Sequence, residues 1–287
     1  MLNEPNPPIL DHAIGQRSAF TAEKLMKEYR RIREVPEGAV PPVCILEFDG
    51  DLTDWLVQVR MAKSFPSWAC FHTTMFAMNL EGVPCGIIAR TIGGPYAVLI
   101  AEQLHAAGAK MIIGLTSAGR LAPDLPLPCL VVATSAVRDE GTSYHYLAPS
   151  QEATCPTPVA AHFERELAAA TGWNVRSGKV WTTDAPYRET REQIDKWASE
   201  NALAVEMQTA SLFAFGTARH AHVASVVMVS NAVDHQGEQF DTGSRADGLR
   251  ILKAIARAAR AYLETECCVH SDSDSDSATR LEHRLDV

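Results

Sequence analysis

The sequence predicts an α/β fold with three layers, in which a sheet lies between helices. Short apolar runs alternate with segments of helical periodicity between residues 43 and 263, as in sheets whose strands are connected by helices. The clearest unit, Gly86 to Leu121, is an apolar strand, a Gly-Gly-Pro turn, a helix and a second apolar strand that ends in Thr-Ser-Ala-Gly. Glycines at strand ends let backbone N–H groups approach a ligand, and the helix beginning near Tyr96 directs its positive end to the same crevice. We therefore expect a small polar or anionic ligand there.

The elements before this unit are predicted from local sequence features. Thr21 is a typical helix N-cap, and a Gly-Asp turn follows the first apolar strand. The Pro- and Asn-rich residues 1–20 predict an N-terminal arm. We expect a helix over 21–35, a strand over 43–47, a helix over 52–63, and strands over 68–76 and 83–92.

The second half of the chain continues the alternation of strands and helices. We expect strands over 129–133, 178–182, 203–207 and 223–229, and helices over 158–170, 189–201, 209–218 and 245–263. Residues 138–150, rich in turn formers and aromatics, predict a surface or active-site loop. The acidic, low-complexity residues 264–287 predict a disordered tail. Residues 21–263 then form one catalytic domain.

Composition excludes several classes of protein. Hydrophobic residues make up 46% of the 287 residues and charged residues 21%, which is ordinary for a globular domain. A net charge of −9 without a basic cluster argues against a nucleic-acid partner. No apolar run approaches a membrane span, and the first residues do not resemble a signal peptide, so we expect a cytoplasmic protein with no membrane partner. The seven cysteines show no metal-ligand spacing, so no metal is expected.

The turns at the strand ends resemble those of the family-I nucleoside phosphorylases, the group that holds uridine phosphorylase, purine nucleoside phosphorylases and methylthioadenosine nucleosidases. The resemblance covers most of residues 40–263 and is carried by Gly50-Asp51, Ile92-Gly93-Gly94-Pro95, Thr116-Ser117-Ala118-Gly119, Val205-Glu206-Met207-Gln208 and Ser230-Asn231. It implies a single-domain sandwich around a mixed, partly barrelled sheet. It also implies a homo-oligomer (dimer, trimer or hexamer) that cleaves the N-glycosidic bond of a nucleoside with phosphate as co-substrate and no cofactor.

The resemblance assigns the ribose to Glu206, Met207 and Gln208. Glu206 would support the cationic sugar of the transition state, and Gln208 stands where the family has a second carboxylate. An amide can still bond a hydroxyl, but it brings no negative charge. A local alternative is that Glu206 caps the helix that follows it.

The base site is assigned by the same resemblance to Asn231 and Tyr187. Asn231 would hold the leaving purine through N7 as a hydrogen-bond donor, and Tyr187 would stack on the base. Asp234 could supply a proton if its loop folds back, although acidic residues are common in such turns. His145 is a weaker candidate, in a loop that could close over the 5′ end of a nucleoside.

The expected phosphate site departs most from the family. Its expected members are Gly50, Gly94, Thr116, Ser117 and His72. The three arginines that usually bind phosphate are absent, because their positions hold Asp54, Gly114 and Phe71. Loss of these cations weakens dianion binding, and the candidates for compensation are His72, Arg90 and Arg120.

Three functions remain open at this point. The first is phosphorolysis of a purine-type nucleoside, such as methylthioadenosine or an adenosine-like compound, with uridine also possible. The second is hydrolysis of the same bond, with Asp51 or Asp54 activating water. The third is a nucleoside-binding homologue with weak or no turnover.

Overall fold

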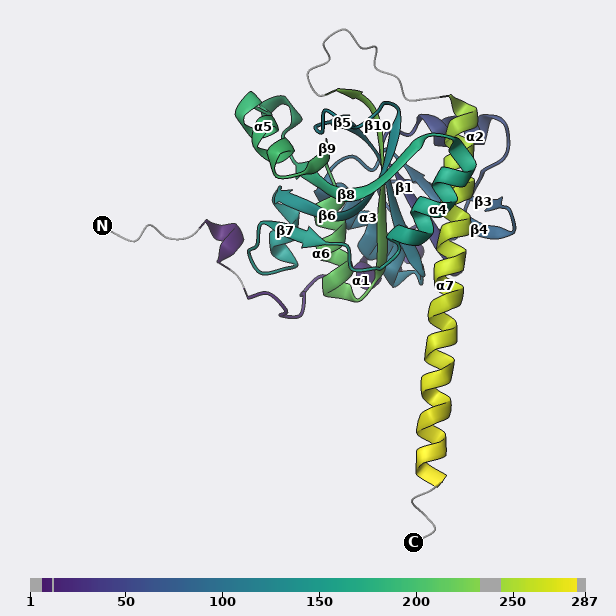
Figure 1. Cartoon of the computed structure of the whole chain (residues 1–287). Coiled ribbons are helices and arrows are strands. Elements are labelled where there is room, and N and C mark those ends of the chain that lie inside the picture. The colour runs from purple at the N-terminus through teal and green to yellow at the C-terminus, as the bar shows by residue number, and fades with distance from the viewer. Residues whose placement is uncertain (1–6, 12, 233–243, 283–287) are drawn as a thin grey trace.

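The computed structural model describes residues 7–11, 13–232 and 244–282 (Figure 1). Within that part of the chain a ten-stranded sheet has the order β10-β6-β8-β9-β5-β1-β4-β3-β2, and β7 pairs with β6. The strands are β1 (Val43–Glu47), β2 (Lys63–Ser64), β3 (Met75–Leu80), β4 (Val83–Ala89), β5 (Met111–Arg120), β6 (Cys129–Asp139), β7 (Glu152–Thr154), β8 (Asn174–Thr183), β9 (Ala202–Glu206) and β10 (His222–Ala232).

Part of the sheet closes into a barrel. Strand β10 pairs with β6 and also with β5, so β10, β6, β8, β9 and β5 form a ring. The sheet is mixed, because β10 runs parallel to β5 and antiparallel to β6. Strand β1 lies outside the ring between β5 and β4 and is parallel to both. The predicted mixed, partly barrelled sheet is therefore confirmed.

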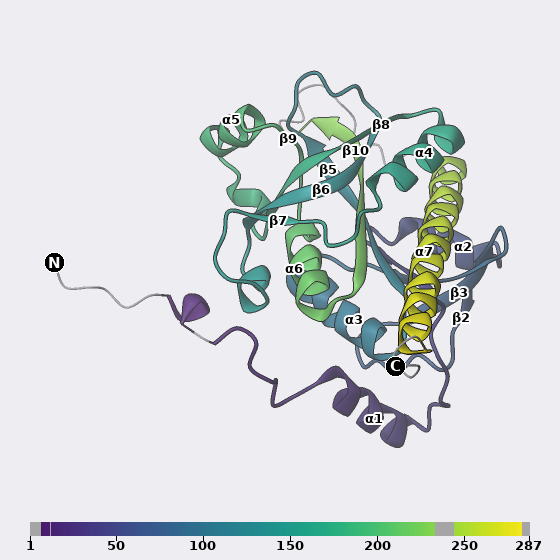
Figure 2. The same ribbon diagram turned by 60° about the horizontal axis from the view of Figure 1, so that its bottom comes forward.

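Helices cover both faces of the sheet (Figures 1 and 2). One layer holds α1, α3 and α6, whose buried side chains share a core with Cys44, Ile112 and Val227. The opposite layer holds α2, α4 and α7, which share a second core with Ile45 and Ile113. The helices are α1 (Ala22–Arg33), α2 (Asp51–Gln58), α3 (Gly94–Ala106), α4 (Ala160–Thr171), α5 (Arg191–Ser199), α6 (Thr209–Arg219) and α7 (Arg245–Glu282), with short 3-10 turns η1 (Pro8–Leu10), η2 (Thr142–His145) and η3 (Pro186–Arg188).

Two predicted elements differ from the structure. The predicted strand over 68–76 is wrong over most of its length, because β3 begins only at Met75. Its apolar residues are buried all the same, as Trp68 and Cys70 lie 5% and 3% exposed in a loop. The last helix was expected to end at Leu263 before a disordered tail, but α7 continues to Glu282. Figure 1 shows its C-terminal half projecting away from the sheet. Within the described residues no helix has the length and apolar character that crossing a membrane requires.

Candidate functional site

Strands β1, β4 and β5 end together and bring their turns to one edge of the sheet. Glu47 pairs with Ala89 on one side and with Leu115 on the other. Two backbone bonds extend this alignment past the strand end: Thr91 N donates to Glu47 O (3.1 Å) and Phe48 N donates to Leu115 O (2.9 Å). The turn at Gly50 therefore lies between the end of β4 and Thr116-Ser117 of β5.

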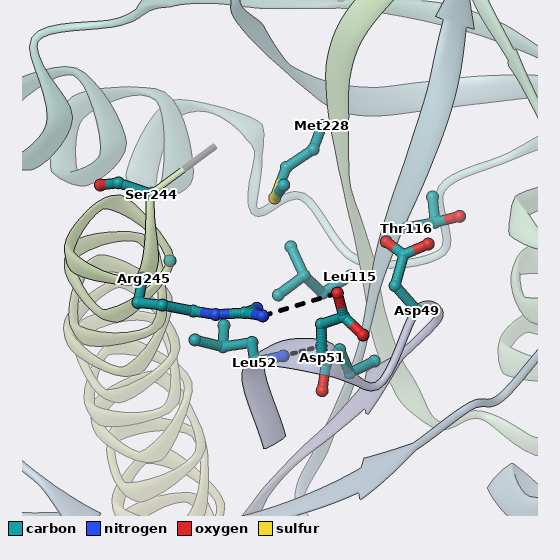
Figure 3. Close-up of a pocket in the computed structure, with 10 residues that line it drawn as sticks. Asp49, Asp51, Leu52, Leu115, Thr116, Met228, Ser244 and Arg245 are labelled. Carbon is teal, nitrogen blue, oxygen red and sulfur yellow. Dashed lines mark hydrogen bonds and ion pairs between the residues drawn. The ribbon is translucent and has the colours of Figure 1, made fainter. Parts of the chain in front are cut away.

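A pocket opens at this edge between the Gly50 turn, β5, β10 and the start of α7. Figure 3 shows Asp49 beside Thr116, and Arg245 extending from α7 toward Asp51. The Nη2 of Arg245 lies 3.6 Å from Oδ2 of Asp51, while Met228 of β10 adds an apolar wall. Of the predicted phosphate ligands, Thr116 lines this pocket, and Gly50 lies in the chain between two lining residues, Asp49 and Asp51.

Asp49 is a member of this pocket that sequence reasoning missed. Ser117, another predicted phosphate ligand, donates its hydroxyl to Oδ1 of Asp49 at 3.0 Å. Burial raises the pKa of Asp49 above its ordinary value, with a further contribution from the negative charge of Asp51. In the sequence, its position directly before the turn glycine could have indicated it. A half-buried carboxyl group beside hydroxyl donors is suited to proton transfer.

Buried glutamates lie where several strands end. Glu47, at the end of β1, accepts hydrogen bonds from Leu52 N and Thr53 N, both at 2.9 Å, and from the hydroxyl of Thr53. The N-cap residue of α2 is Gly50, which has no side chain to offer, so Glu47 satisfies the first N–H groups of this helix. Glu140, which follows β6, accepts from Ser143 N (3.0 Å) and from the Ser211 hydroxyl (2.5 Å).

Glu206, at the end of β9, bonds the first N–H groups of α6 as Glu47 bonds those of α2. Its carboxylate accepts hydrogen bonds from Gln208 N (2.8 Å), Thr209 N (3.0 Å) and the Thr182 hydroxyl (2.5 Å). The side chain is buried, and this burial raises its pKa. These contacts are those of a helix cap, which the sequence offered as the local alternative to a ribose-binding role.

The other two predicted ribose residues differ from each other. Met207 is partly exposed, whereas Gln208 is fully buried. Both amide atoms of Gln208 lack a hydrogen-bond partner among the described residues. A Cβ on Gly114 would lie 3.4 Å from Gln208 Nε2 and 3.0 Å from a methyl carbon of Leu212. Two departures from the family pattern, Gly114 and Gln208, are therefore neighbours in space, and the amide lies close to where an arginine side chain would begin.

Gly94 begins α3 directly against α6. A Cβ at this position would lie 2.1 Å from Ser211 Oγ and 2.9 Å from Ser211 Cβ, so close packing of the two helices requires glycine. His72 lies in the loop before β3 and packs against the first turn of α3, where the Tyr96 hydroxyl donates to His72 O at 3.4 Å. Its side chain is exposed.

The structure describes part of the predicted base site. Tyr187 lies on η3 and is 100% exposed, so it stacks on no other side chain among the described residues. The backbone of Asn231 lies in β10 opposite Gly119 of β5, after a register shift. Asp234 lies outside the described residues. His145 is exposed on η2.

The cations expected to replace the missing arginines lie in different places. The Nη1 of Arg120 donates to Leu125 O at 3.3 Å. Arg90, directly after β4, bonds the carboxylate of Asp54 through both of its terminal nitrogens, with Nη1 3.2 Å from Oδ1. This bond lowers the pKa of Asp54 below its ordinary value. Asp51 and Asp54, the two predicted water-activating acids, each lie within ion-pair distance of an arginine.

Comparisons with known proteins identify the family of this chain. A family model described as the phosphorylase superfamily matches residues 43–264, which include all of these turns. The chain belongs to the phosphorylase superfamily. The match runs from β1 into α7, and it confirms the family that the strand-end turns predicted.

Individual relatives are distant. The guanosine phosphorylase of Halorubrum lacusprofundi is 28% identical over 192 residues, which are 63% of this chain and 74% of the relative. The uridine phosphorylase of Treponema pallidum is 29% identical over 157 residues, 51% of this chain and 60% of the relative. A crystal structure of uridine phosphorylase from Vibrio fischeri ES114 superposes with a TM-score of 0.60 at 26% identity and covers 76% of this chain and 91% of that one.

These relatives place the chain among the nucleoside phosphorylases, which are pentosyltransferases that take phosphate as a substrate. The expected enzyme class and co-substrate are thereby supported at the level of the family. Among residues 7–11, 13–232 and 244–282, no group of three or more His, Cys, Asp or Glu side chains is placed to hold a metal ion.

Proposed function

We propose that this superfamily member cleaves the N-glycosidic bond of a purine-type nucleoside with phosphate and releases a free base and a sugar 1-phosphate. The observation that carries the proposal is the alignment of β1, β4 and β5 at one sheet edge, where Asp49, Asp51 and Thr116 line a single pocket. Gly50 lies between the two aspartates in the chain, and Ser117 bonds Asp49. Similarity to a guanosine phosphorylase supports a purine base. Similarity to uridine phosphorylases keeps uridine as an alternative substrate.

The proposal assigns each site residue a role in binding phosphate, sugar or base from its position in the fold. In this proposal phosphate is bound between the Gly50 turn and Thr116, and the sugar lies toward Met207 and Gln208 at the start of α6. The buried Gln208 amide, which has no partner among the described residues, supplies hydrogen bonds to a sugar hydroxyl. Glu206 acts by holding the first turn of α6, since its oxygens are engaged by that turn. Asn231 supports the departing base.

Base release from a nucleoside panel tests the proposal. Phosphate-free protein is incubated with guanosine, adenosine, methylthioadenosine, inosine and uridine, with and without added phosphate, and the free base is separated by chromatography. We expect release of at least one purine base that requires phosphate. Equal release without phosphate, or release from no member of the panel, would contradict the proposal.

Hydrolysis is the second candidate, and the position of Asp49 favours it. Its raised pKa and its bond from Ser117 suit a base that removes a proton from water. Asp51 lies 3.6 Å from Arg245, and the bond from Arg90 lowers the pKa of Asp54, so an arginine lies beside each of these two carboxylates. If water is the nucleophile, Asp49 is therefore the better base than the two acids named from the sequence.

The Asp49→Asn variant distinguishes the two reactions. Loss of a general base reduces a rate by about 100-fold or more, so any phosphate-independent release is expected to fall by that factor, while phosphate-dependent release stays within about tenfold. The asparagine Oδ1 can still accept from Ser117, which preserves the turn. The hydrolytic rate of the unmodified protein should rise with pH through the Asp49 pKa, because only the ionised carboxylate accepts a proton. A hydrolytic rate unchanged in Asp49→Asn would exclude this role, and Asp51→Asn is the control.

We also propose that the enzyme is a homo-oligomer. Large apolar side chains remain exposed near the start of α3: Ile92 is 52% exposed, Phe71 42% and Leu99 40%. Contact with a second copy would remove this apolar surface from water. Light scattering should give a mass that is a multiple of the 31.3 kDa chain, and a monomer would contradict the expectation.

A further inference from the structure

The Gly50 turn has a cation, Arg90, that comes from the end of β4, whereas the resemblance placed an arginine at position 54 on α2. Arg90 directly follows β4, and its backbone has φ of 58°, an unusual conformation for a residue other than glycine. Its side chain crosses to the neighbouring turn, where a Cβ on Gly50 would lie 2.6 Å from Arg90 Cγ and 3.0 Å from Arg90 Cζ. Only a glycine at position 50 leaves room for this arginine.

Arg90 and Thr116 lie on opposite sides of the Gly50 turn. Glu47 pairs with Ala89 and with Leu115, so the next residues along the flanking strands are Arg90 and Thr116. The guanidinium group, which lies against Gly50, is therefore at the same sheet edge as Thr116. Its partner, Asp54, occupies the position at which the sequence resemblance led us to expect an arginine.

The Arg90–Asp54 pair is suited to exchange of the Asp54 carboxylate for a phosphate. Both nitrogens of the arginine fork bond the two carboxylate oxygens, and the same fork geometry matches two oxygens of a phosphate. The side chains are 54% and 58% exposed, so an anion can reach them from solvent. An exposed ion pair contributes only about 0–1 kcal/mol to stability, which leaves little structural reason for an arginine held across the turn.

We propose that Arg90 binds the phosphate substrate in this chain, and that Asp54 is an internal counterion which the phosphate displaces. The inference rests on the proposed phosphorolysis at the same edge and identifies the cation that serves it. Because Asp54 competes with phosphate for the same fork, removing its charge should strengthen phosphate binding, whereas removing Arg90 should weaken it.

Four proteins test this proposal: the unmodified chain, Arg90→Met, Asp54→Asn and the control Arg31→Met. Arg31 also pairs with an acid at the surface, Glu28, but on α1. For Arg90→Met we expect the KM for phosphate to rise about 10- to 100-fold, the loss typical of charge-assisted hydrogen bonds, with the nucleoside KM nearly unchanged. Asp54→Asn should lower the phosphate KM several-fold, and Arg31→Met should change neither constant.

Phosphate binding is also measured without turnover, from the rise in melting temperature with inorganic phosphate compared with sodium chloride of equal ionic strength. A rise in the unmodified chain that Arg90→Met abolishes supports the proposal even if no nucleoside is cleaved, in which case only the proposed function fails. The role of Arg90 would be overturned if Arg90→Met and the unmodified chain had the same phosphate KM and the same rise in melting temperature with phosphate. No rise in the unmodified chain and no phosphate-dependent turnover would overturn both proposals.

Discussion

Gly94→Ala is expected to destabilise the fold by about 3 kcal/mol or more, at the upper end of overpacking substitutions. The new Cβ would lie 2.1 Å from Ser211 Oγ and 2.9 Å from Ser211 Cβ, and both atoms belong to the buried helix α6. The hydroxyl of Ser211 also bonds Glu140, so it cannot turn away without breaking that contact. Urea unfolding of the variant and the unmodified chain measures the difference.

A second substitution separates packing from phosphate binding. Ser211→Gly removes both clashing atoms, so Gly94→Ala with Ser211→Gly should be more stable than Gly94→Ala alone. Gly141→Ala is the matched control, because its Cβ would have only ordinary contacts of 3.5 Å and 3.7 Å and φ there is −92°. If Gly94→Ala unfolds at the same urea concentration as the unmodified chain, the packing argument is wrong. If the double variant is stable but has a raised phosphate KM, Gly94 also serves the anion.

Glu206→Ala is expected to cost about 3–5 kcal/mol, because it removes the acceptor of buried donors at Gln208 N, Thr209 N and the Thr182 hydroxyl. Each buried donor without a partner costs about 1–3 kcal/mol. Glu192→Ala, in the exposed first turn of α5, should change stability by less than about 0.5 kcal/mol. Chemical unfolding of both variants compares a buried cap with an exposed acid in the first turn of a helix.

Glu206→Gln then distinguishes capping from catalysis. The amide oxygen retains an acceptor for the helix N–H groups, so most of the stability should remain. In our proposal Glu206 holds α6 in place, and kcat of the folded variant should fall by less than about tenfold. A fall of about 100-fold or more at preserved stability would correspond to lost electrostatic stabilisation of the transition state, and would show that the carboxylate acts on the sugar cation.

The strand ends could be predicted from sequence because their signals are local. Glycine pairs and Thr-Ser turns follow apolar runs, and their order along the chain identified the family and hence the barrelled sheet. The boundaries of Thr21-capped α1 and of β1 were predicted for the same reason. Apolar content alone misled at residues 68–74, where the structure has a buried loop.

The contacts that define the site depend on side chains that meet across the sheet edge. Nothing near Arg90 in the sequence indicates that it crosses to Gly50, or that Asp54 is its partner. The acid before Gly50 gave no sign of the bond from Ser117, 68 residues away. Register between β1, β4 and β5 creates these contacts, and register could not be derived from the pattern of apolar residues.

The identity of the sugar product tests the central claim most directly. Phosphate-free protein is given guanosine, or the best purine nucleoside of the panel, together with inorganic phosphate, and the reaction is followed by phosphorus NMR alongside the free base. Phosphorolysis predicts a sugar 1-phosphate resonance that grows in a one-to-one ratio with the base and consumes an equal amount of phosphate. Release of the base with free sugar and unchanged phosphate would contradict the account and assign the chain to hydrolysis.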